Sequence, residues 1–266
     1  MKVTAIKPRR GIYFLPSAFT VANLFCGFYS IINGTRREFE LAAVLIGYAI
    51  LLDTLDGRIA RFANATSEFG REFDSLADVV SFGVAPGVLV YIWALHLWPR
   101  LGWLTCFLFV ICGAMRLARF NIQRNVPDKR FFVGMPIPAA AAVLASIVFM
   151  FPSPLGSKAI ALPILVLVVI LALLMVSKLR YYSFKDIDLR RRQTYLAILL
   201  LAMVFVVVYS HPQVMLLALS FAYMTSGPVL KLHGIIRRSH LSGPPQAAYP
   251  AREEELAPSA PKDHES

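Results

Sequence analysis

The sequence predicts an all-α polytopic membrane protein with about eight transmembrane helices. Of its 266 residues, 57% are hydrophobic and only 16% are charged. Apolar runs such as AIALPILVLVVILALLMV and TYLAILLLAMVFVVVY approach the roughly 20 residues that a helix needs to cross a bilayer. A soluble helical bundle would instead show polar faces on most of its helices. We therefore expect an integral membrane protein.

The apolar runs divide into eight expected spans. Pro16, Pro136 and Pro212 stand where spans begin, and proline is favoured in the first turn of a helix. Pro163 falls inside a span, where it is expected to kink the helix. The expected spans are residues 16–34, 39–63, 71–96, 101–122, 136–152, 157–178, 193–210 and 213–233.

The distribution of basic residues predicts the orientation. Of the 27 lysines and arginines, all lie on the side of the N-terminus except Arg36, Arg37, Arg100 and Lys158. Basic loops face the cytoplasm, so both termini are expected there, in a bacterial inner membrane. The net charge of +11 is then a membrane signal that favours anionic lipids, and no nucleic-acid partner is expected.

The chain is expected to contain one membrane domain with two flanking segments. Residues 1–15 form a basic cytoplasmic segment, without the cleavage site of a signal peptide. Residues 16–235 form the membrane-embedded domain. Residues 236–266 are rich in proline, alanine and charge, which is typical of a disordered tail.

Four carboxylates stand in otherwise apolar surroundings. Asp53 and Asp56 are three residues apart, and Asp74 and Asp78 are four apart, so each pair lies on one face of its helix. A turn is expected around Ala65, midway between Asp56 and Asp74. Two antiparallel helices joined there would bring both pairs to the same depth, near the cytoplasmic surface.

Four carboxylates that converge repel one another unless they are neutralised. Ligation by oxygen alone favours a hard divalent ion, Mg²⁺ or Mn²⁺. Two such ions close together assist phosphoryl displacement. Gly57, Ala60 and Gly70 leave room beside the acids for a bulky ligand such as a nucleotide, although Gly70 equally suits close helix packing. Arg61 is a candidate partner for a substrate phosphate.

The same stretch resembles the signature of the CDP-alcohol phosphatidyltransferase family, D-x2-D-G-x2-A-R-x8-G-x3-D-x3-D. The matching positions are Asp53, Asp56, Gly57, Ala60, Arg61, Gly70, Asp74 and Asp78. Flanking segments, FLPSAFTVANLFCGF, DVVSFGVAP, RLARFN and VGMPIPAAA, resemble the membrane-integral branch that uses serine as the acceptor. The resemblance covers residues 12–235. Ser17 departs from it, because the family often carries asparagine there.

The resemblance implies an activity and its cofactors. The phosphatidyl group of CDP-diacylglycerol would pass to the hydroxyl of L-serine by direct displacement, with release of CMP. Two metals are implied, one held by Asp53, Asp56 and Asp74, and the other by Asp53, Asp74 and Asp78. A homodimer is also implied.

The resemblance further implies roles for single residues. Gly57, Arg61 and Ser67 would contact the CDP moiety, and Asp78 would accept the proton of the serine hydroxyl. Like other CDP-alcohol phosphatidyltransferases, the chain would form a helical bundle in the membrane.

Further candidates are polar residues in apolar runs. Thr20 and Asn23 are expected either in the CDP-diacylglycerol site or in hydrogen bonds between helices. A serine carboxylate calls for a guanidinium, although interfacial snorkelling explains an arginine at the end of a span equally well. The candidates for the acceptor site are Ser81, Arg116, Arg119 and Asn121.

Two alternative functions stay open. The same chemistry could serve another alcohol, such as glycerol 3-phosphate, an inositol phosphate or choline. A cation transporter could also use acids inside the membrane, but these four acids are expected near one surface rather than at the midplane.

Overall fold

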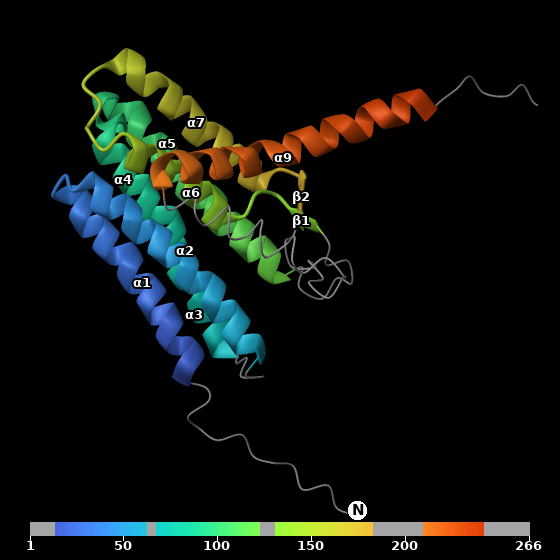
Figure 1. The fold of residues 1–266 in the computed structure, drawn as a ribbon, viewed down its shortest axis with the longest axis horizontal. Helices are drawn as coiled ribbons and strands as arrows, with labels where there is room; N and C mark the ends of the chain where they lie inside the picture. The colour runs from blue at the N-terminus through green and yellow to red at the C-terminus, as the bar shows by residue number, and fades with distance from the viewer. Residues whose placement is uncertain (1–13, 63–67, 123–130, 183–209, 242–266) are drawn as a thin grey trace, which may run out of the picture. The chain divides into compact units, whose positions relative to one another are not determined.

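The computed structural model describes residues 14–62, 68–122, 131–182 and 210–241 (Figure 1). The chain divides into a unit of Met1–Lys231 and a unit of Leu232–Ser266, and the contacts below belong to the first unit. Seven of the eight expected spans coincide with helical stretches. The remaining one, 193–210, lies almost wholly outside the described residues.

Six of these stretches are single α-helices: α1 (Phe14–Thr35), α2 (Phe39–Phe62), α5 (Pro99–Ile122), α6 (Ile137–Met150), α7 (Lys158–Val176) and α9 (Pro212–Leu241). The span expected at 71–96 is composite. It consists of α3 (Glu68–Asp78), the π-helical segment η2 (Val79–Val84) and α4 (Ala85–Trp93), followed by the 3₁₀ turn η3 (Leu95–Leu97).

Among the described residues, four helical stretches are long and apolar enough to cross a membrane: Glu68–Trp93, Pro99–Ile122, Lys158–Val176 and Pro212–Lys231. Helix α6 is apolar but shorter. Their length and composition are those of an integral membrane protein.

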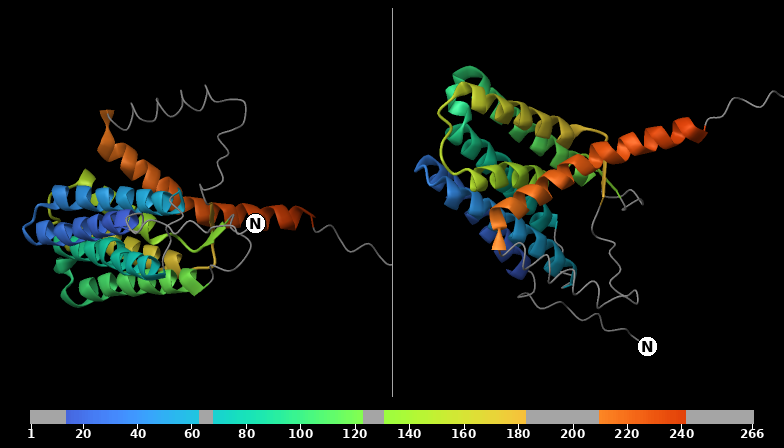
Figure 2. Two further views of the ribbon diagram at one scale, coloured as in Figure 1. Left: turned by 90° about the horizontal axis from the view of Figure 1, so that it is seen from below. Right: turned by 45° about the horizontal axis from the view of Figure 1, so that its top comes forward.

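Helix α1 organises the first half of the bundle. It runs beside α2, as Figures 1 and 2 show, and it also contacts α3, η2 and α4. Helix α2 contacts η2 and α4, but its backbone scarcely approaches that of α3. The two helices that carry the acids are therefore linked mainly through α1.

Small and polar residues allow this close packing. Gly27 faces η2, and a β-carbon at that position would lie 2.6 Å from the Cα atom of Ser81. The Ser81 hydroxyl donates a hydrogen bond to the carbonyl of Asn23 (3.0 Å), and the Ser30 hydroxyl donates one to the carbonyl of Ala42 (2.7 Å). Helix α1 is thus held to both of its neighbours by buried hydrogen bonds.

Two short strands depart from the all-helical expectation. Strand β1 (Phe131–Val133) pairs antiparallel with β2 (Arg180–Tyr182). Gly134 follows β1 with a φ of 83°, a left-handed conformation that glycine adopts without steric cost. Its amide donates to the carbonyl of Leu179 (2.8 Å). The chain that enters α6 is therefore joined to the chain that leaves α7.

We expect Gly27→Ala to destabilise the protein, because the added methyl group meets backbone that cannot move independently. Overpacking of this kind costs roughly 1–3 kcal/mol. Thermal unfolding of the detergent-solubilised protein measures the effect. Gly47→Ala on α2 is the matched control, because a β-carbon there meets nothing within 4 Å. Equal melting temperatures for the two variants would contradict the packing argument.

Candidate metal and substrate site

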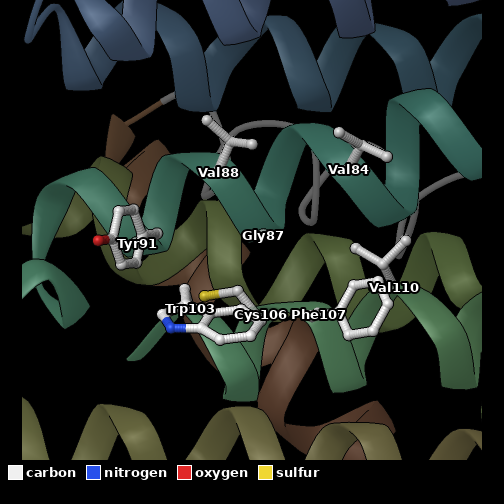
Figure 3. A pocket seen from close by; sticks show the side chains of 8 residues that line it. All are labelled: Val84, Gly87, Val88, Tyr91, Trp103, Cys106, Phe107 and Val110. Carbon is white, nitrogen blue, oxygen red and sulfur yellow. The ribbon is translucent and has the colours of Figure 1, made fainter. Parts of the chain in front are cut away.

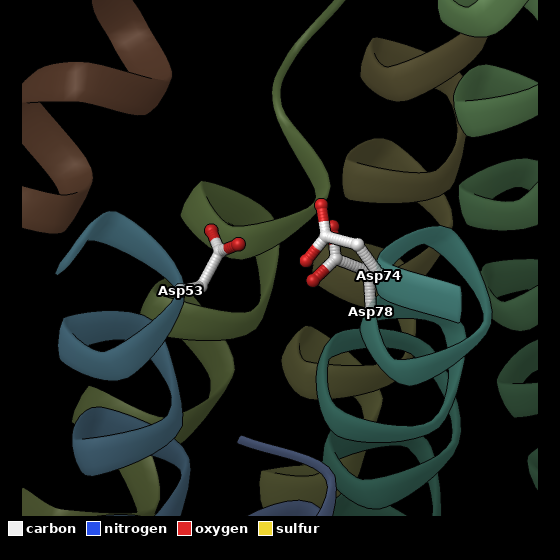
Figure 4. Close-up of side chains that lie close together, drawn as sticks. All are labelled: Asp53, Asp74 and Asp78. Atoms are coloured by element: carbon white, nitrogen blue, oxygen red, sulfur yellow. The ribbon is translucent and has the colours of Figure 1, made fainter. Parts of the chain in front are cut away.

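Three of the four predicted acids converge between α2 and α3. Asp53 extends from α2, while Asp74 and Asp78 extend from successive turns of α3 (Figure 4). One carboxylate oxygen from each lies within 4.8 Å of the other two. The predicted meeting of the two helix faces is confirmed for these three residues.

The three carboxylates form an electrostatically unfavourable group. At 4 Å and an effective dielectric constant of 20, two like charges repel by about 4 kcal/mol. Asp78 is buried, and Asp53 and Asp74 are partly buried, so water screens them incompletely. A group of this composition favours a bound cation, and its oxygen ligands suit Mg²⁺ or Mn²⁺.

Asp56 is oriented differently from the other three acids. It is buried, and its Oδ2 atom accepts a hydrogen bond from the Thr20 hydroxyl (2.5 Å). Its Oδ1 atom is buried and has no hydrogen-bond partner among the described residues. A buried carboxylate oxygen without a donor is costly. Asp56 does not belong to the group whose oxygens lie within 4.8 Å of one another, so its role as a metal ligand stays a prediction.

Helix α1 orients one acid on each of its neighbours. Thr20 binds Asp56 of α2, and the Asn23 side-chain amide donates to Asp78 Oδ1 of α3 (3.3 Å). Thr20 and Asn23 are three residues apart, so they lie on one face of α1. Of the two roles left open for them, hydrogen bonding between helices is confirmed, and contact with CDP-diacylglycerol stays a prediction.

Packing among the described residues gives no reason for a glycine at position 57. A β-carbon at this position would meet nothing within 4 Å, and the residue is exposed. Glycine inside a helix costs about 1 kcal/mol relative to alanine. Space for a ligand beside Asp56 would explain why glycine, rather than a better helix former, stands at this position.

The other predicted nucleotide contacts are described less fully. Ser67 and the side chains of Ala60 and Arg61 lie outside the described residues. Gly70 lies in the first turn of α3 and is partly buried.

Arg116 of α5 is the buried cation beside the acids. Only 8% of its surface is exposed, and it interacts electrostatically with Asp78. Its guanidinium lies 5.7 Å from the centroid of the Phe120 ring, and its Nε atom has no hydrogen-bond partner in the part of the chain that the structure describes. A snorkelling arginine would expose its guanidinium, so burial favours a role inside the site. Arg119 is partly exposed.

Ser81 and Asn121 connect helices around the acids. Ser81 is fully buried and donates to the backbone of α1, as described above. The Asn121 amide donates to the Ser75 hydroxyl of α3 (2.9 Å). These bonds hold α3 and η2 in place, and direct contact of either residue with an acceptor stays a prediction.

The sequence interpretation missed Tyr223. This residue of α9 interacts electrostatically with Arg116. The signal available in the sequence was its position in FAYMTSGP, a polar stretch within an apolar span.

An apolar pocket lies elsewhere, between α4 and α5 (Figure 3). Its volume is about 230 Å³, and Tyr91, Trp103 and Cys106 are among the residues that line it. None of its lining residues is an acid or a base. It therefore does not contribute to the charged site.

Comparison with known proteins supports the family that the acid motif indicates. The sequence model of the CDP-alcohol phosphatidyltransferase family matches residues 13–176. The chain is 42% identical, over 205 residues, to the CDP-diacylglycerol–serine O-phosphatidyltransferase of Helicobacter pylori strain J99, covering 75% of this chain and 84% of that protein. It is 40% identical, over 139 residues, to the protein of the same name from Bacillus subtilis strain 168, covering 52% of this chain and 77% of that protein.

We expect Asp74→Asn to raise the melting temperature of the metal-free protein and to reduce the increase caused by Mn²⁺. The substitution removes one repelling charge and one ligand. About 1 kcal/mol corresponds to a shift of roughly 2–4 °C in a domain of this size. Thermal unfolding with a chelator and then with Mn²⁺ measures both effects. Glu40→Gln, at an exposed position of α2, is the control; an undiminished response of Asp74→Asn to Mn²⁺ would argue against ligation by Asp74.

Proposed function

Because the chain belongs to the CDP-alcohol phosphatidyltransferase family, we propose that it transfers the phosphatidyl group of CDP-diacylglycerol to the hydroxyl of L-serine, forming phosphatidylserine and CMP. The observation that carries the choice of serine is the identity of 42% to a serine O-phosphatidyltransferase, over 84% of that protein. The convergent carboxylates and the buried arginine are the groups that this chemistry requires.

The acids fit the divalent metals that the family implies. We propose that Asp53, Asp56 and Asp74 hold one Mg²⁺ or Mn²⁺ ion, and that Asp53, Asp74 and Asp78 hold a second. The unpartnered Oδ1 atom of Asp56 and the closeness of the other three acids support this assignment. When bound, the ions would neutralise charge on the pyrophosphate during displacement.

We propose that the nucleotide lies beside Asp53 and Asp56, the first two acids of the motif. Gly57 supplies the space, and Arg61 and Ser67 are proposed to contact the CDP moiety. Ala60 and Gly70 keep the neighbouring helix surfaces small. Thr20 and Asn23 serve this site by holding two of the acids, whether or not they also contact the substrate.

The reaction is proposed to be a single displacement. The serine oxygen forms a bond to the phosphorus that carries diacylglycerol, and the bond from that phosphorus to the CMP oxygen breaks. Asp78 accepts the proton of the serine hydroxyl. Arg116 lies beside Asp78, so a serine carboxylate bound to Arg116 would bring the hydroxyl near that acid.

The membrane arrangement is also a proposal. We expect eight spans within residues 16–235, flanked by cytoplasmic segments at 1–15 and 236–266. The concentration of lysine and arginine supports an active site and two termini on the cytoplasmic side of a bacterial inner membrane. Family resemblance supports a homodimer.

The direct test uses the purified full-length protein in detergent. It is incubated with CDP-diacylglycerol, labelled L-serine and Mn²⁺ or Mg²⁺, and both CMP and labelled lipid are measured. We expect equal amounts of the two products and no turnover after chelation. Turnover only with glycerol 3-phosphate, an inositol phosphate or choline would replace serine as the acceptor. Ion flux into liposomes without CMP release would favour a transporter.

We expect Asp78→Asn to lower kcat by about 100-fold or more, because an amide cannot accept the proton. Binding of CDP-diacylglycerol, measured at equilibrium, should be largely retained. Glu72→Gln, at an exposed position of α3, is the matched control. Near-normal turnover of Asp78→Asn would refute the assignment of Asp78 as the proton acceptor.

We expect Gly57→Ala to lower kcat/KM for CDP-diacylglycerol by roughly 10- to 100-fold without lowering the melting temperature. The methyl group meets no atom of the described segments within 4 Å, but it would displace the nucleotide, and a displacement of about 1 Å is enough for an effect of this size. Steady-state kinetics and thermal unfolding separate the two effects. Gly47→Ala on the same helix controls for the added methyl group. An unchanged kcat/KM would place the nucleotide elsewhere.

A further inference from the structure

Helix α3, which carries Asp74 and Asp78, depends on its neighbours for its position. It has 11 residues, and a helix of that length is marginal in isolation. The π-helical segment η2 begins directly after Asp78 and interrupts the regular α-helical hydrogen bonds. Helix α2 offers little support, because its backbone scarcely approaches that of α3. The placement of the two acids must therefore be set mainly by other helices.

One end of α3 is fixed by α1. The Asn23 side-chain amide donates to Asp78 Oδ1 (3.3 Å), and the Asn23 carbonyl accepts a hydrogen bond from the Ser81 hydroxyl of η2 (3.0 Å). Both bonds lie at the C-terminal end of α3 or beyond it. At 1.5 Å per residue, Asp74 lies about 6 Å further along the helix axis, so a pivot of roughly 10° at Asp78 would move Asp74 by about 1 Å.

Ser75 provides a second attachment, one residue after Asp74. Its hydroxyl accepts a hydrogen bond from the Asn121 side-chain amide of α5 (2.9 Å) and donates one to the carbonyl of Arg71 in α3 (3.1 Å). The backbones of α3 and α5 make few contacts with each other, whereas η2 and α5 pack closely. The Asn121–Ser75 bond therefore reaches α3 at a point that the backbone packing of α5 does not support.

Attachments to two different helices restrict α3 more than an attachment to one. A helix held only at Asp78 could tilt about that point, and a bond from α5 one turn earlier opposes the tilt. The repulsion among the acids makes such a restraint necessary. A displacement of about 1 Å is enough to lower turnover strongly. The restraint therefore acts on the length scale that matters for the reaction.

We propose that Ser75 is a positioning residue, which Asn121 holds so that Asp74 stays in place beside Asp53 and Asp78. Ser75 acts through the backbone of α3, because its hydroxyl already donates to the carbonyl of that helix. The proposal rests on the proposed function and deepens it. It assigns Asn121 to the metal side of the site instead of to the acceptor.

Ser75→Ala in the full-length protein tests this role. Alanine is the better helix former, so the substitution does not weaken α3 itself. We expect the Mn²⁺ concentration that gives half of the maximal thermal stabilisation to rise about tenfold, since outer-shell changes weaken metal binding by roughly 10- to 100-fold. The kcat at saturating Mn²⁺ should fall by about tenfold, and the KM for L-serine should stay unchanged.

Ser220→Ala is the matched control. The Ser220 hydroxyl of α9 shares a hydrogen bond with that of Ser146 in α6 (2.9 Å) and also lies 2.9 Å from the carbonyl of Leu217 in its own helix. Neither of these helices carries one of the acids. We expect a lower melting temperature, with the Mn²⁺ requirement and kcat unchanged. The same pattern in Ser75→Ala would show a purely structural role and would overturn the proposal.

Asn121→Ala separates positioning from contact with the acceptor. If Asn121 acts only through Ser75, its variant should show the same effects as Ser75→Ala, and the double variant should resemble either single one. A rise in the KM for serine in Asn121→Ala alone would place Asn121 against the acceptor. Multiplicative effects of the two substitutions would likewise overturn the proposal.

The wild-type protein distinguishes failure of this inference from failure of the proposed function. If Mn²⁺ stabilises the wild-type protein, serine is transferred, and Ser75→Ala behaves identically, only the inference fails. If Mn²⁺ neither stabilises the wild-type protein nor supports release of CMP, the proposed metal site is wrong, and the inference fails with it.

Discussion

The mutual repulsion of three carboxylates is the constraint on which the rest of the structure depends. Asp53, Asp74 and Asp78 place their oxygens within 4.8 Å of one another inside an apolar bundle. Such an arrangement is unfavourable without cations, so the packing of the surrounding helices must keep the three side chains close together despite their repulsion. This repulsion supports the proposed metal site, because a group of acids held close together in advance need not rearrange to bind divalent ions.

Helix α1 holds two of the acids in position by hydrogen bonds. Thr20 and Asn23 provide one hydrogen bond to an acid on each neighbouring helix, and the close contact of Gly27 with Ser81 holds η2 against α1. Because α2 and α3 make few backbone contacts with each other, the acids of both helices are held mainly by α1. The π-helical segment begins directly after Asp78, as is frequent at functional sites.

The acceptor side is built from elements that are distant in the sequence. Arg116 comes from α5, whereas the acids come from α2 and α3. The proposed metal ligands and the proposed acceptor residue thus lie on different helices.

The sequence by itself determined the class of protein, most of the helices and the identity of the acids. Hydropathy and the spacing of residues along one helix are local properties, so Asp74 and Asp78 could be assigned to a common face from their separation alone. Only the tertiary structure decided that Asp56 turns to Thr20 while the other three acids meet, and that Arg116 is buried. Those outcomes depend on how each helix is rotated against its neighbours, which packing between distant segments determines and local periodicity does not.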